Sequence, residues 1–490
     1  MVDNLEDSDE TSKYKIDIFF DEIGYSRYHY MLMFVLILIF FADGSEILVI
    51  SLILKSLEKE WHITPLEKSF IASSAFIGLM IGSFTTSQII DRYGRKKLLL
   101  IGSGIVIIFG YLSSVSSNGI ELFFFRLIMG IGIGTQIPAA TNLAAESIPS
   151  YNRSIYLANM WIAFPIGEIY ICIVAMYIMQ NFEQDQWRVL LLYCIIPVVL
   201  CFIGSFFLYE SSRYYLANNL SDQARNVLLG LSKWSGRNID AARIDEIIDE
   251  GLRNPLNKYA STYSQLLNKR FLSLSINSWC IWFITYFSVY TTIYMLPQIL
   301  AYNEQGKSVE KSSLFKDIVI TNLIALPKTI IAGFMAEIKF LGRKYSMLSS
   351  LFFTAITTLF LTMLIEHINF FAGLMKLLIG VTIGVCKVYT TEAYPTKLRG
   401  LGYGTGHSFA RLAGTLVPFI AEAMVHLFGL VSPFILVFFA SGLGVYNAYS
   451  LPFETLGRKL DTVERDDLIE LKERLDNGLC NLPTTNYGTL

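Results

Sequence analysis

The chain has 490 residues, of which 53% are hydrophobic and 16% are charged. Soluble domains average about 25% charged residues. The low charge, with a mean hydropathy of +0.47, therefore indicates a protein that crosses a membrane several times. A net charge of −2 argues against nucleic-acid binding, which needs a basic surface. The start, MVDNLEDSDETSKYK, is acidic and polar, unlike a cleavable signal peptide, so we expect the first span to insert as an internal anchor.

Twelve apolar stretches are long enough to cross a bilayer, which takes about 20 residues. They lie at roughly 30–54, 68–90, 98–116, 120–143, 155–179, 188–209, 272–300, 315–337, 345–366, 368–391, 402–426 and 431–450. Lys and Arg gather in the tails and in the loops of one side, so we expect both termini in the cytoplasm. The prediction is an all-α, multi-pass protein of the plasma membrane or an organelle membrane.

A polar segment between the sixth and seventh stretches divides the chain into two halves. The predicted parts are a cytoplasmic tail at 1–29, a six-helix bundle at 30–209, a cytoplasmic linker with short helices at 210–271, a second six-helix bundle at 272–450 and a cytoplasmic tail at 451–490.

Short motifs of the first half recur in the second. The first copies are GRKK at Gly94, AESIPSYNRS around Glu146, and YESSRYYL from Tyr209; the second copies are GRKY at Gly342, TEAYPTKLRG around Glu392, and PFETLGRKL from Pro452. Matching residues are 244 to 248 positions apart, and the three pairs occur in the same order. This regularity indicates a duplicated six-helix unit.

The motifs resemble those of the major facilitator superfamily. DRYGRKK, RLIMGIGIG, ESIPSYNR, YESSRYYL, YTTEAYPTKLRG and PFETLGR resemble its sugar-porter and organic-ion branches. The opening DEIGYSRYHYMLMFVLILIFFADGSEILVIS and the later ARLAGTLVPFIAE are most similar to the synaptic-vesicle-protein-related branch. The resemblance implies two pseudo-symmetric bundles of six helices with a substrate site between them, which opens to each side in turn.

The resemblance also implies a cytoplasmic gate whose charges pair to hold that side shut. Its residues are Asp91, Arg92, Gly94, Arg95, Glu146, Arg153, Glu210, Arg213, Arg343, Glu392, Arg399 and Glu454. The second copy departs from the family pattern because Lys339 stands where an acid is expected, with Glu337 two residues earlier. Anchoring by positive loops accounts for part of this charge without a gate.

Charged residues inside spans are costly and usually mark function. Asp43 and Glu46 share a face of the first span, and Arg126 in the fourth span lies at a depth similar to that of Glu46. Similarity to proton-coupled sugar porters implies that Glu46 takes up a proton and releases Arg126, with Asp43 one turn away. A static pair that only fixes helix packing is the alternative.

Other polar and aromatic residues are candidates for binding substrate. Lys328 and Arg411 are cations inside spans eight and eleven, where similar organic-anion carriers also have cations. The alternatives are that Lys328 reaches to the interface and that Arg411 pairs with Glu168 or Glu422. Trp282, Tyr286 and Tyr290 form one face of span seven, and Trp161 and Glu168 could face them from span five. The aromatic residues could instead be a packing stripe.

We therefore expect a secondary active transporter of an organic anion, a carboxylate metabolite or vitamin, coupled to protons. A sugar, polyol or organic-cation porter remains an alternative, as does a non-transporting receptor or scaffold. The sequence has no Walker A motif, catalytic triad or metal-ligand cluster, so we expect no enzyme activity, cofactor or metal site. The expected partners are the solute, protons and lipid, and we expect a monomer.

Overall fold

The computed structural model describes residues 15–149, 156, 160–179, 186–237, 239–253, 263–303 and 312–456, and these contain no β-strand. The helices of the first half are α2 (Arg27–Trp61), α3 (Pro65–Tyr93), α4 (Arg95–Ser114), α5 (Gly119–Ser147), α7 (Ala163–Ile178) and α8 (Gln186–Phe206). Those of the second half are α13 (Lys269–Asn303), α14 (Ser312–Ala325), α15 (Lys328–Glu337), α16 (Gly342–Met363), α17 (Ile368–Ala393), α18 (Thr396–Phe428) and α19 (Ser432–Tyr449), with the 3₁₀ turn η2 (Ile365–His367).

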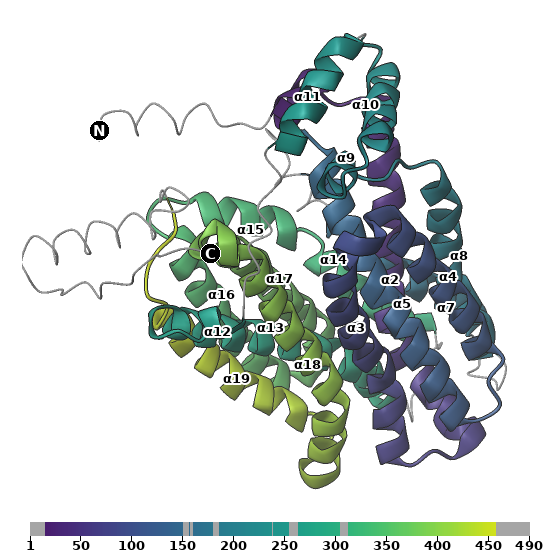
Figure 1. The fold of residues 1–490 in the computed structure, drawn as a ribbon. Coiled ribbons are helices and arrows are strands. Elements are labelled where there is room, and N and C mark those ends of the chain that lie inside the picture. The colour runs from purple at the N-terminus through teal and green to yellow at the C-terminus, as the bar shows by residue number, and fades with distance from the viewer. Residues whose placement is uncertain are drawn as a thin grey trace, which may run out of the picture.

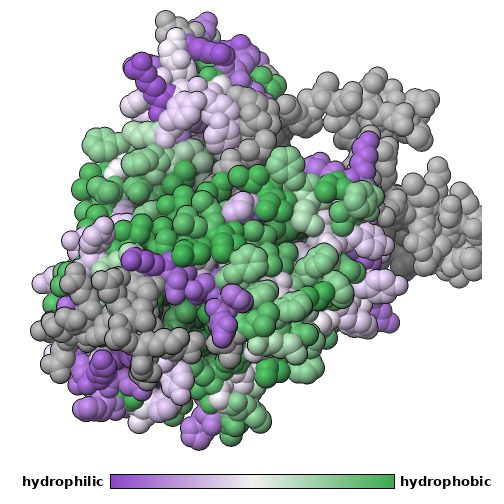
Figure 2. Space-filling view, turned by 180° about the vertical axis from the view of Figure 1, so that it is seen from behind, coloured by the Kyte–Doolittle hydropathy of each residue, from purple (hydrophilic) through white to green (hydrophobic). Residues whose placement is uncertain are grey.

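Eleven helical segments in the described part of the chain are long and apolar enough to cross a membrane. The eighth predicted span is one of them, but it is broken between α14 and α15 at Pro327, which cannot continue the hydrogen-bonding pattern. The fifth predicted span contains the shorter apolar helix α7. Exposed apolar side chains form a broad band across the rear face, with hydrophilic residues above and below it (Figure 2). This distribution is that of a protein surrounded by lipid.

Local signals in the sequence set the helix ends. Thr64 and Glu67 form a capping box at the start of α3, with Pro65 in the first turn. The same helix ends at Gly94, whose φ of 95° is strained for any residue with a side chain. α16 begins at the equivalent Gly342, with a φ of 61°. Both copies of the G-R-K motif therefore place a glycine of positive φ at the start of the next helix.

The helices pack into two halves that lie side by side (Figure 1). In the first half α5 packs on α3 and α4, and α2 packs on α7 and α8. In the second half α16 packs on α17 and α19, and α13 packs on α18 and α19. The halves meet where α3 faces α18, α7 faces α14 and α2 faces α13. The predicted architecture of two six-helix bundles is confirmed, and it leaves a long interface between them.

Short helices cover one end of the first half (Figure 1). They are α1 (Lys15–Ile23), α9 (Ser212–Ala217), α10 (Ser221–Ser235) and α11 (Ala241–Arg253), while α12 (Tyr263–Leu266) lies against α13 and α18. Phe19 and Phe20 of α1 are buried among side chains of α10 and α11. Arg225 of α10 binds Asp245 of α11, and this hydrogen bond lowers the pKa of the Asp245 carboxyl. We call this end of the molecule the linker side and the opposite end the far side.

Candidate functional site

The two halves are joined at the far side by polar contacts. Lys68 of α3 forms an ion pair of 2.9 Å with Glu422 of α18. The Ser73 hydroxyl donates to the Thr415 carbonyl at 2.8 Å, also from α3 to α18. At the linker side, the contact of Lys387 with the Trp161 ring is the one polar contact between the halves among the described residues. The structure is thus closed at the far side.

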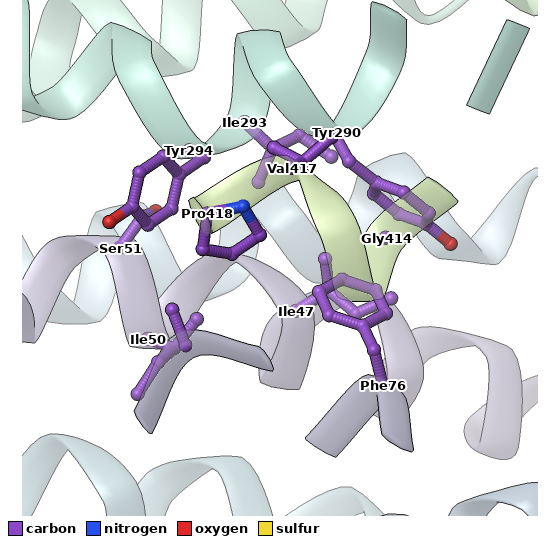
Figure 3. Close-up of a pocket in the computed structure, with 11 residues that line it drawn as sticks. Ile47, Ile50, Ser51, Phe76, Tyr290, Ile293, Tyr294, Gly414, Val417 and Pro418 are labelled. Atoms are coloured by element: carbon purple, nitrogen blue, oxygen red, sulfur yellow. The ribbon is translucent and has the colours of Figure 1, made fainter. Parts of the chain in front are cut away.

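A small apolar pocket lies just inside these far-side contacts (Figure 3). Its walls come from four helices: α2, α3, α13 and α18. The lining residues are Ile47, Ile50, Ser51, Ala72, Phe76, Tyr290, Ile293, Tyr294, Gly414, Val417 and Pro418. Phe76 and Tyr290 approach one another across the two halves, with ring centroids 4.6 Å apart. The lining of the pocket is almost wholly apolar. It therefore separates the far side from the charged residues that lie nearer the middle of the molecule.

Glu46 and Arg126 form a buried pair, as expected from their similar depth. The Glu46 carboxylate accepts from Arg126 Nη1 at 2.9 Å, and the Glu46 carbonyl accepts from Nη2 at 3.2 Å. Glu46 is 3% exposed and Arg126 is 1% exposed. Both residues belong to the first half, on α2 and α5. Movement of one half against the other therefore does not by itself separate them.

Asp43 faces the second half instead. Its carboxylate lies 4.0 Å from Arg411 Nη2, and neither carboxylate oxygen has a hydrogen-bond partner among the residues described. Arg411 donates to the Tyr290 hydroxyl at 3.0 Å. The sequence offered Glu168 or Glu422 as partners of Arg411, and the structure gives Arg411 neither of them. Asp43 and Arg411 form a loose ion pair between the halves.

A tighter ion pair between the halves joins Glu168 of α7 to Lys376 of α17. The Lys376 ammonium lies 2.8 Å from the Glu168 carboxylate and also donates to the Asn322 side chain of α14. Glu168 is 1% exposed and Lys376 is 4% exposed. The sequence predicted Glu168 as a residue of the substrate site, whereas Lys376 was overlooked. The lysine was visible as the one charge in the apolar run GLMKLLIG.

Two lysines in the same region have no carboxylate partner among the described residues. Lys328, at the start of α15, lies over Gly380 of α17, where a β-carbon would sit 2.2 Å from the lysine side chain. The Lys387 ammonium lies 3.2 Å from the centre of the Trp161 ring, across the two halves. Contact with an aromatic face stabilises a cation but does not neutralise it. Both lysines are partly accessible.

Aromatic side chains form a layer on the linker side of these charges. Trp282 and Tyr286 stack with their centroids 5.8 Å apart and an interplanar angle of 9°. His407 of α18 contacts Trp282 at 4.8 Å and stacks on Trp161 at 6.0 Å, so it connects the halves. The two tryptophans and Tyr286 were predicted to lie here, whereas His407 was overlooked.

The predicted gate charges of the first half form one network. The Glu210 carboxylate accepts from the backbone N–H groups of Arg95 and Lys96 at the start of α4. The Arg95 guanidinium binds Asp91 and Glu146, each at 2.9 Å. A β-carbon at Gly94 would lie 2.4 Å from the Glu210 carboxylate, so only glycine fits. The carboxylate caps α4 while the arginine ties α3 to α5.

The second half repeats this network. Glu454 accepts from the backbone N–H groups of Arg343 and Lys344, each at 2.8 Å. The Arg343 guanidinium lies 3.2 Å from Glu392 and 3.4 Å from Glu337. Glu337 therefore takes the place of the acid that the motif lacks at position 339. All of these contacts lie within one half, so in this conformation they brace each half without joining the two.

Three other predicted gate residues lie elsewhere in this region, and a fourth is outside the described part. Arg92 lies near the Tyr93 ring, and its carbonyl accepts from the Tyr214 hydroxyl. Arg213 pairs with Asp17 of α1 and so holds the first helix to the linker. Arg399 follows the start of α18. Arg153 lies outside the described residues.

The fold and this interface define a class of protein: a membrane transporter built from two six-helix halves. Residues 19–466 match the model of the sugar (and other) transporter family, so the chain belongs to that family of the major facilitator superfamily. The proteins of this family are transporters rather than enzymes. Membership of the family therefore implies that the chain has a small-molecule substrate.

Two relatives show the range of this group. The niacin transporter NiaP of Acinetobacter baylyi is 27% identical, over 83% of this chain and 89% of that protein. The synaptic vesicle 2-related protein of Rattus norvegicus is 27% identical, over 96% of this chain and 86% of that protein. Among solved structures, a partially occluded inward-open form of the xylose transporter XylE from E. coli has a TM-score of 0.71 at 19% identity, covering 89% of this chain and 100% of that one. It shows the fold alone.

Proposed function

We propose that the chain is a secondary active transporter that moves an organic anion, a carboxylate, together with protons. The observation that carries this proposal is an excess of positive charge in the region where the two halves meet. Among the described residues, the central charged cluster has five cations and three carboxylates: Arg126, Arg411, Lys328, Lys376 and Lys387 against Asp43, Glu46 and Glu168. Uncompensated charge inside a membrane protein is costly, and a bound carboxylate would offset that cost.

Two further features support a flat, anionic substrate. The aromatic layer around Trp282 and His407 lies next to the Lys387 ammonium. The name of one relative identifies a transporter of niacin, whose carboxylate stands on a flat ring. A substrate of this kind would place its carboxylate on the lysines and its ring against the aromatic faces.

The test is uptake by proteoliposomes that contain the purified protein. The panel consists of nicotinate, benzoate, acetate, succinate, xylose and tetraethylammonium, each with and without an inward pH gradient. We expect uptake of the aromatic carboxylates, faster with the gradient. Uptake of xylose or of the cation alone would contradict the proposal.

Proton coupling rests on Glu46 and its pairing with Arg126. When a proton neutralises Glu46, Arg126 loses its counter-ion and the pair can rearrange. We expect Glu46→Gln to abolish the pH dependence of carboxylate uptake, measured as initial rates at a series of pH values on either side of neutrality. Wild-type pH dependence in a well-expressed Glu46→Gln variant would show that the pair is only structural.

A neutral sugar or polyol is the second candidate. One observation favours it: Arg411 lies beside Asp43 and Tyr290, so part of its charge is already compensated. In that case xylose would compete with whatever solute is taken up, and the two lysines without a carboxylate partner in the described part of the chain would be dispensable.

A further inference from the structure

The ion pair between Glu168 and Lys376 has an unusual setting. Both side chains are almost fully buried, and they come from different halves. Within the described part of the chain, Glu168 Oε1 and Asn322 Nδ2 have no hydrogen-bond partner. Lys376 lies eight residues into α17, about 12 Å from the far-side end at a rise of 1.5 Å per residue. The pair therefore lies where the halves must separate when the far side opens.

A second cation adjoins the pair. Lys328 covers Gly380, which is one helical turn from Lys376 on the same face of α17. The Lys328 side chain and the Asn322 amide thus lie beside the ion pair, and Lys328 itself has no carboxylate partner among the described residues. Ammonium and amide groups of this kind bind carboxylates well. In the present conformation the Glu168 carboxylate occupies the position that a substrate carboxylate would take.

We infer that an anionic substrate displaces Glu168 from Lys376 and that Glu168 takes up a proton when this happens. This inference rests on the proposed transport of a carboxylate and deepens it, because it assigns a subsite and a second proton position. The reason is the loss of a partner, because Lys376 is the one hydrogen-bonding partner of Glu168 in the described part of the chain. If a substrate carboxylate bound Lys376 while Glu168 stayed ionised, closing the halves would bury the Glu168 carboxylate without a hydrogen-bonded cation, which is costly. A proton from solution on Glu168 removes that cost, and it leaves again when the substrate departs and Lys376 returns to Glu168.

The groups around Glu168 are consistent with this exchange. The charged and titratable side chains that interact with Glu168 are Lys376 of α17, Lys328 of α15, Tyr290 of α13 and Cys172 of α7 itself. Asp43 of α2, the other carboxylate between the halves, has Arg411 as its own neighbour. Glu168 is therefore the carboxylate that responds to the loss of Lys376.

Proton uptake on binding tests the inference directly. Purified full-length protein in detergent micelles, in weakly buffered solution near neutral pH with a pH indicator, is titrated with benzoate, which is ionised throughout. We expect the wild type to take up about one proton or more per benzoate bound, and its affinity to fall about tenfold for each unit of rising pH. The wild-type measurement requires no variant to fold. No proton uptake by the wild type overturns the inference.

Variants then assign the proton. We expect Glu168→Gln to take up one proton fewer per benzoate than the wild type, and Glu168→Asp to keep the wild-type value. Glu60→Gln is the matched control, because Glu60 pairs with Arg188 within the first half, away from the interface between the halves. Proton uptake by Glu168→Gln equal to that of the wild type overturns the inference. The proposed function fails separately, by the absence of carboxylate uptake into proteoliposomes.

Discussion

Lys328 and Lys387 are the residues on which anion binding depends most simply. Neither has a carboxylate partner in the described part of the chain; Lys387 contacts Trp161 of the other half, and Lys328 packs on Gly380 of α17. A hydrogen bond to a charged group contributes about 1.5–3 kcal/mol. Each lysine can therefore contribute to substrate affinity without first giving up an internal partner.

We expect Lys387→Gln and Lys328→Gln each to raise the KM for carboxylate uptake about tenfold or more, since tenfold corresponds to about 1.4 kcal/mol. Lys387→Arg keeps the charge above Trp161 and should retain most of the uptake. The measurement is initial uptake in proteoliposomes over a range of concentrations. An unchanged KM in both Gln variants would exclude the lysines from the substrate site.

Some residue contacts could be predicted from the sequence and others could not. The pairing of Glu46 with Arg126 followed from their depth in two spans. Lys376 was visible as a charge inside a span, but its partner Glu168 is 208 residues away, on a helix of the other half. A lysine near the end of a span, such as Lys387, is expected to reach toward the membrane interface, yet Lys387 lies against Trp161 instead. The sequence shows how deep in its span a residue lies. The direction of its side chain depends on how the helix is rotated about its axis, which the sequence does not show.

At the scale of helices, the repeated motifs act as caps. Glu210 and Glu454 each accept hydrogen bonds from two backbone N–H groups at the start of a helix, α4 or α16. A carboxylate at this position also interacts favourably with the helix dipole. The recurrence of the glutamates at a fixed offset therefore has a structural reason in each half.

We expect Glu210→Gln and Glu454→Gln each to lower the free energy of unfolding by about 1 kcal/mol, because a neutral amide caps less well than a carboxylate. The two effects should add, since the caps lie in different halves. Thermal unfolding of the purified protein in detergent measures both. A melting temperature unchanged in the double variant would contradict the capping role.

The positions of the spans were predicted well, but whether each span forms one continuous helix was not. The spans lie where the apolar stretches predicted, and short helices α9, α10, α11 and α12 lie within the predicted linker at 210–271. The break between α14 and α15 was not predicted, although Pro327 was its signal. The division into bundles at 30–209 and 272–450 stays a prediction at the level of exact residues.

For the whole molecule, the contacts between the halves define one conformation. The polar contacts of α3 with α18 close the far side, and the gate charges of the linker side pair within their own halves. Transport by alternating access requires the far-side contacts to break in each cycle. Each is individually weak, as is suitable for contacts that open and close.

A cross-link between α3 and α18 should therefore stop transport. We expect Lys68→Cys/Glu422→Cys to lose uptake after treatment with a short, reducible bifunctional thiol reagent and to recover it after reduction. The single variants and the wild type receive the same treatment as controls, because four of the five described cysteines are buried. Full uptake by the cross-linked protein would show that the far side need not open there.

The sequence by itself determined the class of the molecule: its spans, its duplicated unit, its family and most of the charged residues within its membrane helices. Those features depend on composition and on local periodicity, which a linear chain displays directly. Only the tertiary structure decided which charges meet. It paired Glu168 with Lys376, set Asp43 opposite Arg411 and, among the residues described, gave Lys328 and Lys387 no carboxylate. These pairings depend on the rotation and close approach of helices from different halves, and no local pattern encodes them.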